Sequence, residues 1–245
     1  MEMNTLEVCC GSLASAVAAV EGRASRIELC SALSLDGLTP SIGLIRELRR
    51  LYPDLLIHVL IRPREGDFVY SEAEVQVMEC DIHEAVAAGA SAIVGGALTP
   101  EGDIDIKTTL RLVQAAEDLP FTFHRAFDQV TFPSLSLRQL AAMGVRRILT
   151  SGGAPTAEAG IPQLRSLVQL AQKVGGLSIL PGGGITSTNA HRILAETGAT
   201  EIHGSCSSLL PNGLRQTSAD EVRAVIDAIA SRSEQVAPCR LPPCS

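Results

Sequence analysis

Short apolar runs alternate with longer helix-like segments along nearly the whole chain. Eight of these runs have the length and composition of buried strands, and each is followed by a segment that predicts a helix. The expected strands are Leu6–Cys10, Arg26–Cys30, Ile57–Pro63, Ala92–Leu98, Phe121–Asp128, Arg147–Gly152, Leu177–Gly182 and Glu201–Ser205. The helices are expected to begin near Ser12, Ser41, Ser71, Asp105, Ser134, Gly160, Thr188 and Ser218.

Helix-boundary signals agree with this alternation. Ser71 with Glu74, and Ser218 with Glu221, have the spacing of a capping box, in which the two side chains satisfy free N–H groups of the first turn. Glycine at the end of a helix permits the left-handed turn that stops it. The glycines expected to act in this way are Gly22, Gly89, Gly144 and Gly198.

Eight strand–helix units predict one fold class. They imply parallel strands joined by right-handed crossovers, and eight such strands close into an α/β (TIM) barrel of about 250 residues, which suits a chain of 245. An open, doubly wound sheet is the alternative. We expect a single barrel domain over residues 1–232 and a loose tail over 233–245, whose cysteines are Cys239 and Cys244.

Side-chain alternation along the strands predicts which residues point into the barrel. In the first two strands the apolar positions must meet the helices, so that the repeated motif Glu7-x-Cys9 and Glu28-x-Cys30 points inward. Later strands add more polar groups to the interior, whereas an unused barrel interior is mostly aliphatic. These later inward residues are His58, Arg62, Arg64, Thr122, His124, Asp128, Glu201, His203 and Ser205.

The inward polar residues fall into two layers. Those near the strand starts, including Arg26, His58 and Glu201, are expected to form a buried ion network, because unpaired buried charges are costly. Those near the strand ends lie where barrels build their active sites. The candidate bases, acids and anion-holding groups are Glu7, Glu28, Arg62, His124, Asp128 and His203, with His124 alternatively a core histidine bonded to Asp128 or a glutamate.

Glycine-rich segments follow the sixth, seventh and eighth strands. Glycine lets main-chain N–H groups approach an anion closely, and many barrels hold phosphate after the last two strands. The same glycines also suit tight turns. The candidate anion-binding residues are Thr150, Ser151, Gly152, Gly182, Gly183, Gly184, Gly204 and Ser205.

Several long motifs resemble one known family. They are Glu7-Val8-Cys9, Arg26-Ile27-Glu28-Leu29-Cys30, Gly37-Leu38-Thr39-Pro40-Ser41, Ile61-Arg62-Pro63-Arg64, Gly66-Asp67-Phe68, Tyr70-Ser71, Thr122-Phe123-His124-Arg125-Ala126-Phe127-Asp128, Leu149-Thr150-Ser151-Gly152 and Pro181-Gly182-Gly183-Gly184-Ile185. In this order the chain is similar to the CutC family, named for copper homeostasis. The resemblance implies a cytosolic, usually oligomeric barrel that binds copper(I), with the proposed copper-ligand cysteines of the family at Cys9 and Cys30.

Two function classes stay open from the sequence. One is copper(I) binding by the inward thiols, and the other is an enzyme acting on a small anionic metabolite, such as a phosphorylated one. The net charge of −7 argues against nucleic acid or an anionic membrane as the partner. The chain has no apolar run near the ~18 residues of a membrane span and no signal-peptide pattern, so we expect a cytosolic homo-oligomer with reduced thiols.

Overall fold

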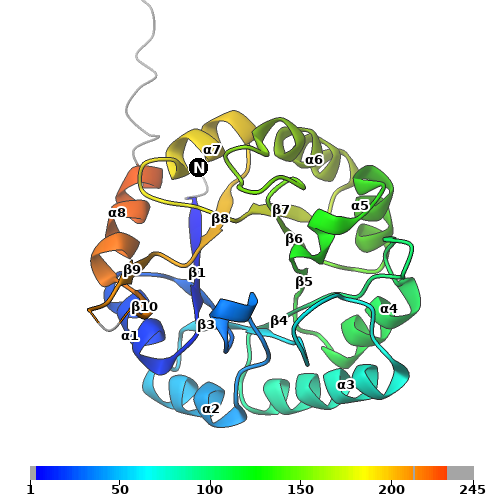
Figure 1. Cartoon of the computed structure of the whole chain (residues 1–245), viewed down its shortest axis with the longest axis horizontal. Helices are drawn as coiled ribbons and strands as arrows, with labels where there is room; N and C mark the ends of the chain where they lie inside the picture. Colours follow the sequence, from blue (N-terminus) through cyan, green and yellow to red (C-terminus); the bar gives the residue numbers. More distant parts are fainter. Residues whose placement is uncertain (1–3, 212, 231–245) are drawn as a thin grey trace, which may run out of the picture.

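Eight parallel strands pair side by side around a barrel (Figure 1). The computed structural model describes residues 4–211 and 213–230. The sheet has the order β7-β6-β5-β4-β3-β2-β1-β8, and a parallel bridge between Gly182 and His203 closes it between its two edges. The strands are β1 (Thr5–Cys10), β2 (Arg26–Leu29), β3 (Leu56–Leu60), β4 (Ala92–Gly95), β5 (Phe121–Phe123), β6 (Arg147–Thr150), β7 (Ser178–Pro181) and β8 (Glu201–Gly204). The predicted barrel is therefore confirmed.

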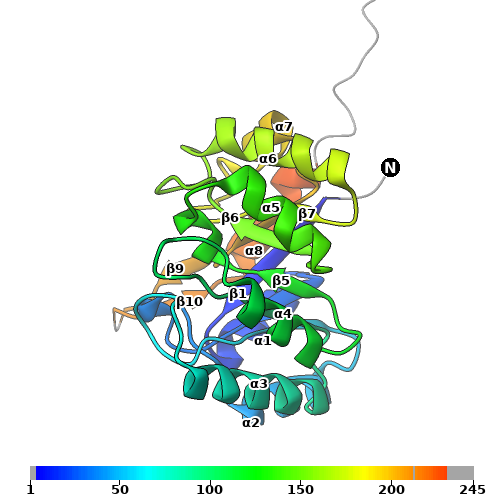
Figure 2. The same ribbon diagram turned by 90° about the vertical axis from the view of Figure 1, so that its right-hand side faces the viewer.

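Helices surround this sheet, one after each strand (Figures 1 and 2). Their starts follow the polar residues expected from the sequence: Ser12, Ser41 and Asp105 accept N–H bonds as N-caps, and the capping box of Ser71 and Glu74 is formed. The helices are α1 (Leu13–Glu21), α2 (Ile42–Leu51), α3 (Glu72–Ala87), α4 (Ile106–Ala115), α5 (Pro133–Ala142), α6 (Ile161–Val174), α7 (Ala190–Thr197) and α8 (Ala219–Ala230).

Shorter elements lie at the strand ends. Two 3-10 turns, η1 (Leu33–Leu35) and η2 (Arg125–Gln129), follow β2 and β5, and a small hairpin of β9 (Ser207–Leu209) and β10 (Arg215–Thr217) follows β8. Figure 2 shows this hairpin at the end of the barrel opposite the start of β1. The fifth strand was expected to continue to Asp128, but it ends at Phe123. The expected tail over 233–245 lies outside the described residues.

The end of the first helix differs from expectation. Gly22 has φ −75°, and the left-handed position falls on Arg23 at φ 72°. Close packing explains the glycine instead, because a Cβ on Gly22 would lie 2.5 Å from Cβ of Val222 on α8. The other expected glycines, Gly89, Gly144 and Gly198, do adopt positive φ.

Two apolar clusters fill the molecule. The larger packs the outer faces of the strands against the helices and includes Val8 and Cys10. The smaller consists of Cys9, Cys30, Leu60 and Val94 inside the barrel. Cys9 and Cys10 thus lie on opposite sides of β1, as alternation along the strand requires. Within residues 4–211 and 213–230, no helix is long and apolar enough to cross a membrane.

Candidate functional site

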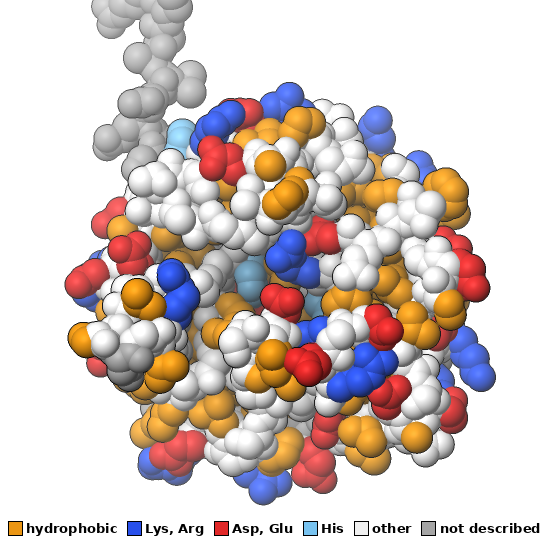
Figure 3. All heavy atoms as spheres, viewed as in Figure 1, with side chains coloured by type: hydrophobic (Ala, Val, Ile, Leu, Met, Phe, Trp, Pro, Cys, Tyr) orange, Lys and Arg blue, Asp and Glu red, His pale blue; other side chains and the backbone are white. Residues whose placement is uncertain are grey.

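A cavity of about 500 Å³ opens at the carboxyl ends of the barrel strands. Figure 3 shows its mouth as a hollow at the centre of this face, with histidine atoms visible inside and charged side chains near the rim. Apolar, acidic and basic residues all contribute to the wall, so the cavity suits a polar ligand. The lining residues are Cys9, Glu28, Leu33, Asp36, Leu60, Arg62, Phe68, His124, Arg125, Asp128, Gln129, Leu149, Gly183, Gly184, Ile185, His203, Gly204 and Ser205.

A buried ion network lies below this cavity, where the sequence predicted one. One oxygen of Glu7 lies 2.7 Å from Arg26 Nε and 2.8 Å from His58 Nδ1, and the other lies 2.9 Å from His203 Nδ1. Arg26 also pairs with Glu201, with 2.6 Å between Nη2 and Oε2. Burial raises the pKa of Glu7, but its bonds to His203 and His58 and the nearby positive charges outweigh burial and hold the pKa well below the ordinary 4.5. Glu7 is therefore ionised, enclosed and absent from the cavity wall.

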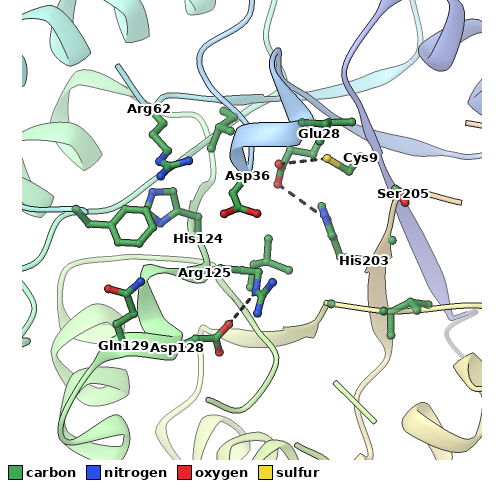
Figure 4. Close-up of a pocket in the computed structure, with 18 residues that line it drawn as sticks. Cys9, Glu28, Asp36, Arg62, His124, Arg125, Asp128, Gln129, His203 and Ser205 are labelled. Carbon is green, nitrogen blue, oxygen red and sulfur yellow. Dashed lines mark hydrogen bonds and ion pairs between the residues drawn. The ribbon is translucent and has the colours of Figure 1, made fainter. Parts of the chain in front are cut away.

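Cys9, Glu28 and His203 form the floor of the cavity (Figure 4). Their possible ligand atoms all lie within 4.8 Å of one another, so they can surround a metal ion. Cys9 Sγ lies 3.9 Å from Glu28 Oε1 and 3.7 Å from the sulfur of Cys30, which is fully buried behind it. The register of the barrel makes this group, because Cys9 on β1 pairs with Glu28 on β2 and the adjacent β8 supplies His203.

The protonation states of this group differ from those of free side chains. The hydrogen bond with Cys30, followed by burial, raises the pKa of Cys9 well above 9.0, so its thiol is protonated near neutral pH. Burial raises the pKa of Glu28 to about 7, which places this carboxyl close to half ionised at neutral pH. Burial lowers the pKa of His203, but the charge of Glu28 and bonds to Cys9 and Glu7 outweigh it and keep this ring protonated.

Arg62 supports the loops at the rim of the cavity. Its Nη1 donates to the carbonyls of Leu35 and Gly37 at 2.8 and 3.0 Å, and its Nη2 donates to the Gly66 carbonyl at 2.9 Å. The guanidinium also lies 5.1 Å from the ring centre of Phe68. Both terminal nitrogens of this predicted anion-holding residue therefore already bind main-chain oxygens.

His124 is a neutral histidine in the cavity wall. Burial, followed by the positive charge of Arg62, lowers its pKa to about 3. The N–H of Ala126 donates to Nδ1 at 3.4 Å, so that Nε2 carries the hydrogen. Neither alternative bond, to Asp128 or to a glutamate, is formed among the described residues, and the ring packs instead beside Phe68, with 4.8 Å between ring centres. His124 thus offers a donor and no charge.

Asp128 binds the loop that follows β6. Its carboxylate accepts the N–H groups of Ser151 and Gly153 at 2.9 and 3.1 Å, and the hydroxyl groups of Thr150 and Ser151. It also accepts a hydrogen bond from Arg125 Nε at 2.8 Å (Figure 4). Arg125 Nη2 donates to Ser151 Oγ at 3.1 Å. Asp128 therefore holds Arg125 in place on the cavity wall.

The structure divides the residues predicted to bind an anion. Gly183, Gly184, Gly204 and Ser205 line the cavity. Thr150, Ser151, Gly152 and Gly182 do not line it. The first two bind Asp128, and Gly182 follows β7 and bridges to His203.

Arg125 is a charged cavity residue that strand alternation missed, and the uncharged Phe68 and Gln129 and the acidic Asp36 were not predicted either. In a continued fifth strand it would share the outward face with Phe123, but η2 starts at Arg125 and turns the chain back over the barrel mouth. The expected strand ran from Phe121 to Asp128, so the sequence pattern gave no signal that Arg125 faces the cavity.

Comparisons with known proteins identify the family and agree with this fold. The CutC family model matches residues 4–208. A human protein named copper homeostasis protein cutC homolog is 44% identical over 210 residues, which cover 86% of this chain and 76% of the relative. A Bacteroides fragilis protein named as a CutC family protein is 42% identical over 214 residues, which cover 87% and 84% of the two chains.

Solved structures extend the comparison. The putative copper homeostasis protein CutC from Streptococcus agalactiae has a TM-score of 0.77 at 35% identity and covers 83% of this chain and 99% of its own. A phosphoribosylanthranilate isomerase from Thermotoga maritima has a TM-score of 0.60 at 14% identity, covers 93% of this chain and 98% of its own, and shares the barrel fold alone. On the family match and these identities, the chain belongs to the CutC family.

Proposed function

We propose that this protein binds copper(I) for copper homeostasis through Cys9 and Cys30. The observation that carries the proposal is the distance of 3.7 Å between their sulfur atoms, inside a barrel whose relatives are named for copper homeostasis. Copper(I) is a soft ion that favours thiolate ligands, and two thiolates from neighbouring strands can share it. Cys9 is the accessible partner, because it lines the cavity while Cys30 lies behind it.

The surroundings favour a thiol-bound ion that enters from the cavity. Glu28 and His203 lie beside Cys9, so the ionised form of Glu28 can take up a proton, and either residue can act as an additional ligand once it is deprotonated. Because the pKa of the Cys9 thiol is raised, its proton must leave when a metal binds. Copper(I) uptake is therefore coupled to proton release.

Copper(I) titration against a competing chelator, under anaerobic conditions, tests the proposal. Cys9→Ala and Cys30→Ala should each lower the affinity, whereas Cys10→Ala is the matched control, since Cys10 faces the helices. Cys239→Ser and Cys244→Ser form the background for every variant, because these tail thiols lie outside the described residues and can bind copper by themselves. Copper binding that depends on the tail alone would contradict a barrel site.

Zinc(II) is the necessary comparison metal. A mixed set of sulfur, nitrogen and carboxylate ligands, such as Cys9, His203 and Glu28, also suits zinc. Zinc binding that survives in Cys30→Ala and exceeds copper(I) binding in affinity would refute copper as the cargo of this site.

The size of the cavity favours a second candidate function, an enzyme acting on a small anionic metabolite. About 500 Å³ is far more than one metal ion occupies, and it matches the pockets that proteins build for small molecules. Glu28 and His203 supply groups for proton transfer, and the neutral His124 supplies a hydrogen-bond donor. Mass spectrometry of small molecules released from the purified protein tests this function. A preparation that releases no stoichiometric anion would count against it.

A further inference from the structure

We propose that the cavity contains an oxyanion subsite formed by the main-chain N–H groups of Gly183 and Gly184 and by Arg125, which binds the phosphate group of a small ligand. This subsite rests on the second proposed function, the binding of a small anionic metabolite. It lies on the side of the cavity built by β5, β6 and β7. Three acidic residues line the cavity: Glu28 belongs to β2, Asp36 directly follows η1, and Asp128 is paired with Arg125 at 2.8 Å.

The loop after β6 is already occupied by an anion of the protein itself. The N–H groups of Ser151 and Gly153 donate to the carboxylate of Asp128, and the hydroxyl of Thr150 donates to the same carboxylate. The N–H of Gly152 donates to the Thr150 hydroxyl at 2.8 Å. The donors of this loop are therefore already bound to Asp128 or to Thr150, and a ligand must find its donors elsewhere on the wall.

Arg125 is fixed in position and keeps one donor nitrogen available. Nε donates to Asp128 and Nη2 donates to Ser151, whereas Nη1 has no hydrogen bond within the described residues. Nη1 lies next to the glycine segment, since a Cβ built on Gly183 would be 3.6 Å from it. The side chain of Arg125 is 45% exposed, so a ligand in the cavity can reach it. An oriented guanidinium with a free N–H is well suited to a phosphate oxygen.

Gly183 and Gly184 provide the second side of the subsite. Both line the cavity, and neither N–H donates a hydrogen bond within the described residues, although the Gly183 carbonyl accepts one from Ala157. Their φ values of 101° and 74° lie in the region that favours glycine, so both positions lack a side chain of their own in the cavity wall. Both glycines and Arg125 line the same cavity, and adjacent N–H groups beside a guanidinium are a common way for proteins to bind phosphate.

The subsite adjoins the floor of the cavity that holds the titratable groups. Gly182, directly before the subsite, bridges to His203, and a Cβ on Gly182 would be 3.4 Å from His203 Cδ2. A ligand with its phosphate at Gly183 therefore extends its remaining atoms toward His203 and Cys9. The ligand class that fits is a small phosphate monoester.

Calorimetric titration of the full-length protein with inorganic phosphate, at constant ionic strength, tests the subsite. Wild-type protein should bind phosphate saturably, and Arg125→Gln should weaken binding at least tenfold by removing the charged donor. Arg46→Gln on α2 is the matched control, because it removes the same charge from an exposed arginine whose ion pair with Glu84 spans 3.7 Å. This control should bind like wild type. Arg125→Lys, which keeps the charge but loses the second donor that binds Ser151, should give an intermediate affinity.

Three outcomes of the phosphate titration would overturn the subsite: no saturable phosphate binding by the wild type, equal binding by Arg125→Gln, or equal loss of binding in Arg46→Gln. Acetate, titrated in the same way, separates phosphate from carboxylate ligands, and acetate binding as tight as phosphate binding would refute the phosphate assignment. A metabolite released by the wild type that binds equally to Arg125→Gln would refute the subsite and leave the second function standing. Melting temperatures of all variants establish that they are folded.

Discussion

Replacing the two glutamates of the repeated Glu-x-Cys motif by glutamine should change the free energy of unfolding in different ways. Glu7→Gln should lower the free energy of unfolding, because it removes the central carboxylate of a buried network that includes Arg26, His58 and His203. Glu28→Gln should leave the free energy of unfolding unchanged or raise it. No arginine pairs with Glu28 among the described residues, and its contacts are with Cys9 and His203.

The expected change in the free energy of unfolding comes from the buried ion pair for Glu7→Gln and from the raised pKa for Glu28→Gln. Removing one partner of a buried ion pair typically costs about 3–5 kcal/mol, and about 3 is expected for Glu7→Gln because Arg26 keeps Glu201. Burial raises the pKa of Glu28 from the ordinary 4.5 to about 7, so its ionisation is harder in the folded state. That difference opposes folding by up to about 3 kcal/mol at neutral pH, and the glutamine removes this penalty.

Urea unfolding followed by circular dichroism, at fixed protein concentration, measures both effects. The pKa of Glu7 is depressed, so its stabilisation is present above pH 4.5 and is lost as the pH falls through the folded pKa. The difference between wild type and Glu7→Gln should therefore shrink in acid. Two results would refute the division into a structural and a site glutamate. One is a decrease in the free energy of unfolding that is as large for Glu28→Gln as for Glu7→Gln, and the other is a decrease below about 1 kcal/mol for Glu7→Gln.

Three further predictions follow from single features. Copper(I) affinity should rise with pH, because the bond with Cys30 and burial raise the pKa of Cys9; pH-independent affinity in chelator competition would argue against thiolate ligands. In urea unfolding, Gly43→Ala should add about 0.4–1 kcal/mol to stability, since nothing lies within 4 Å of its new Cβ, whereas Gly22→Ala should cost about 1–3 kcal/mol through its clash with Val222; the reverse order would contradict the packing. Ser71→Ala should cost about 1 kcal/mol by loss of the capping box of α3, and an unchanged urea midpoint would show that the cap contributes nothing.

Much of the architecture could be predicted because it depends on local patterns. Polar N-caps such as Ser41 and Asp105 act within one turn of a helix, so the helix starts were readable from the sequence. Alternation along β1 placed Cys9 inside and Cys10 outside, since successive side chains of a strand point in opposite directions. The pattern was less informative where a strand ended early, and Arg125 was missed because η2 breaks the alternation after Phe123.

The sequence by itself determined that Glu7 and Glu28 point into the barrel, but not that they differ. Both belong to the same Glu-x-Cys motif, and only the register between strands gives them different neighbours. Glu7 pairs with Arg26 on β2 and with His203 on β8, which keep it ionised and enclosed. Glu28 pairs with Cys9 on β1, without an arginine, and burial raises its pKa. A pKa depends on charges from strands far apart in sequence, so this distinction arises only when the barrel closes.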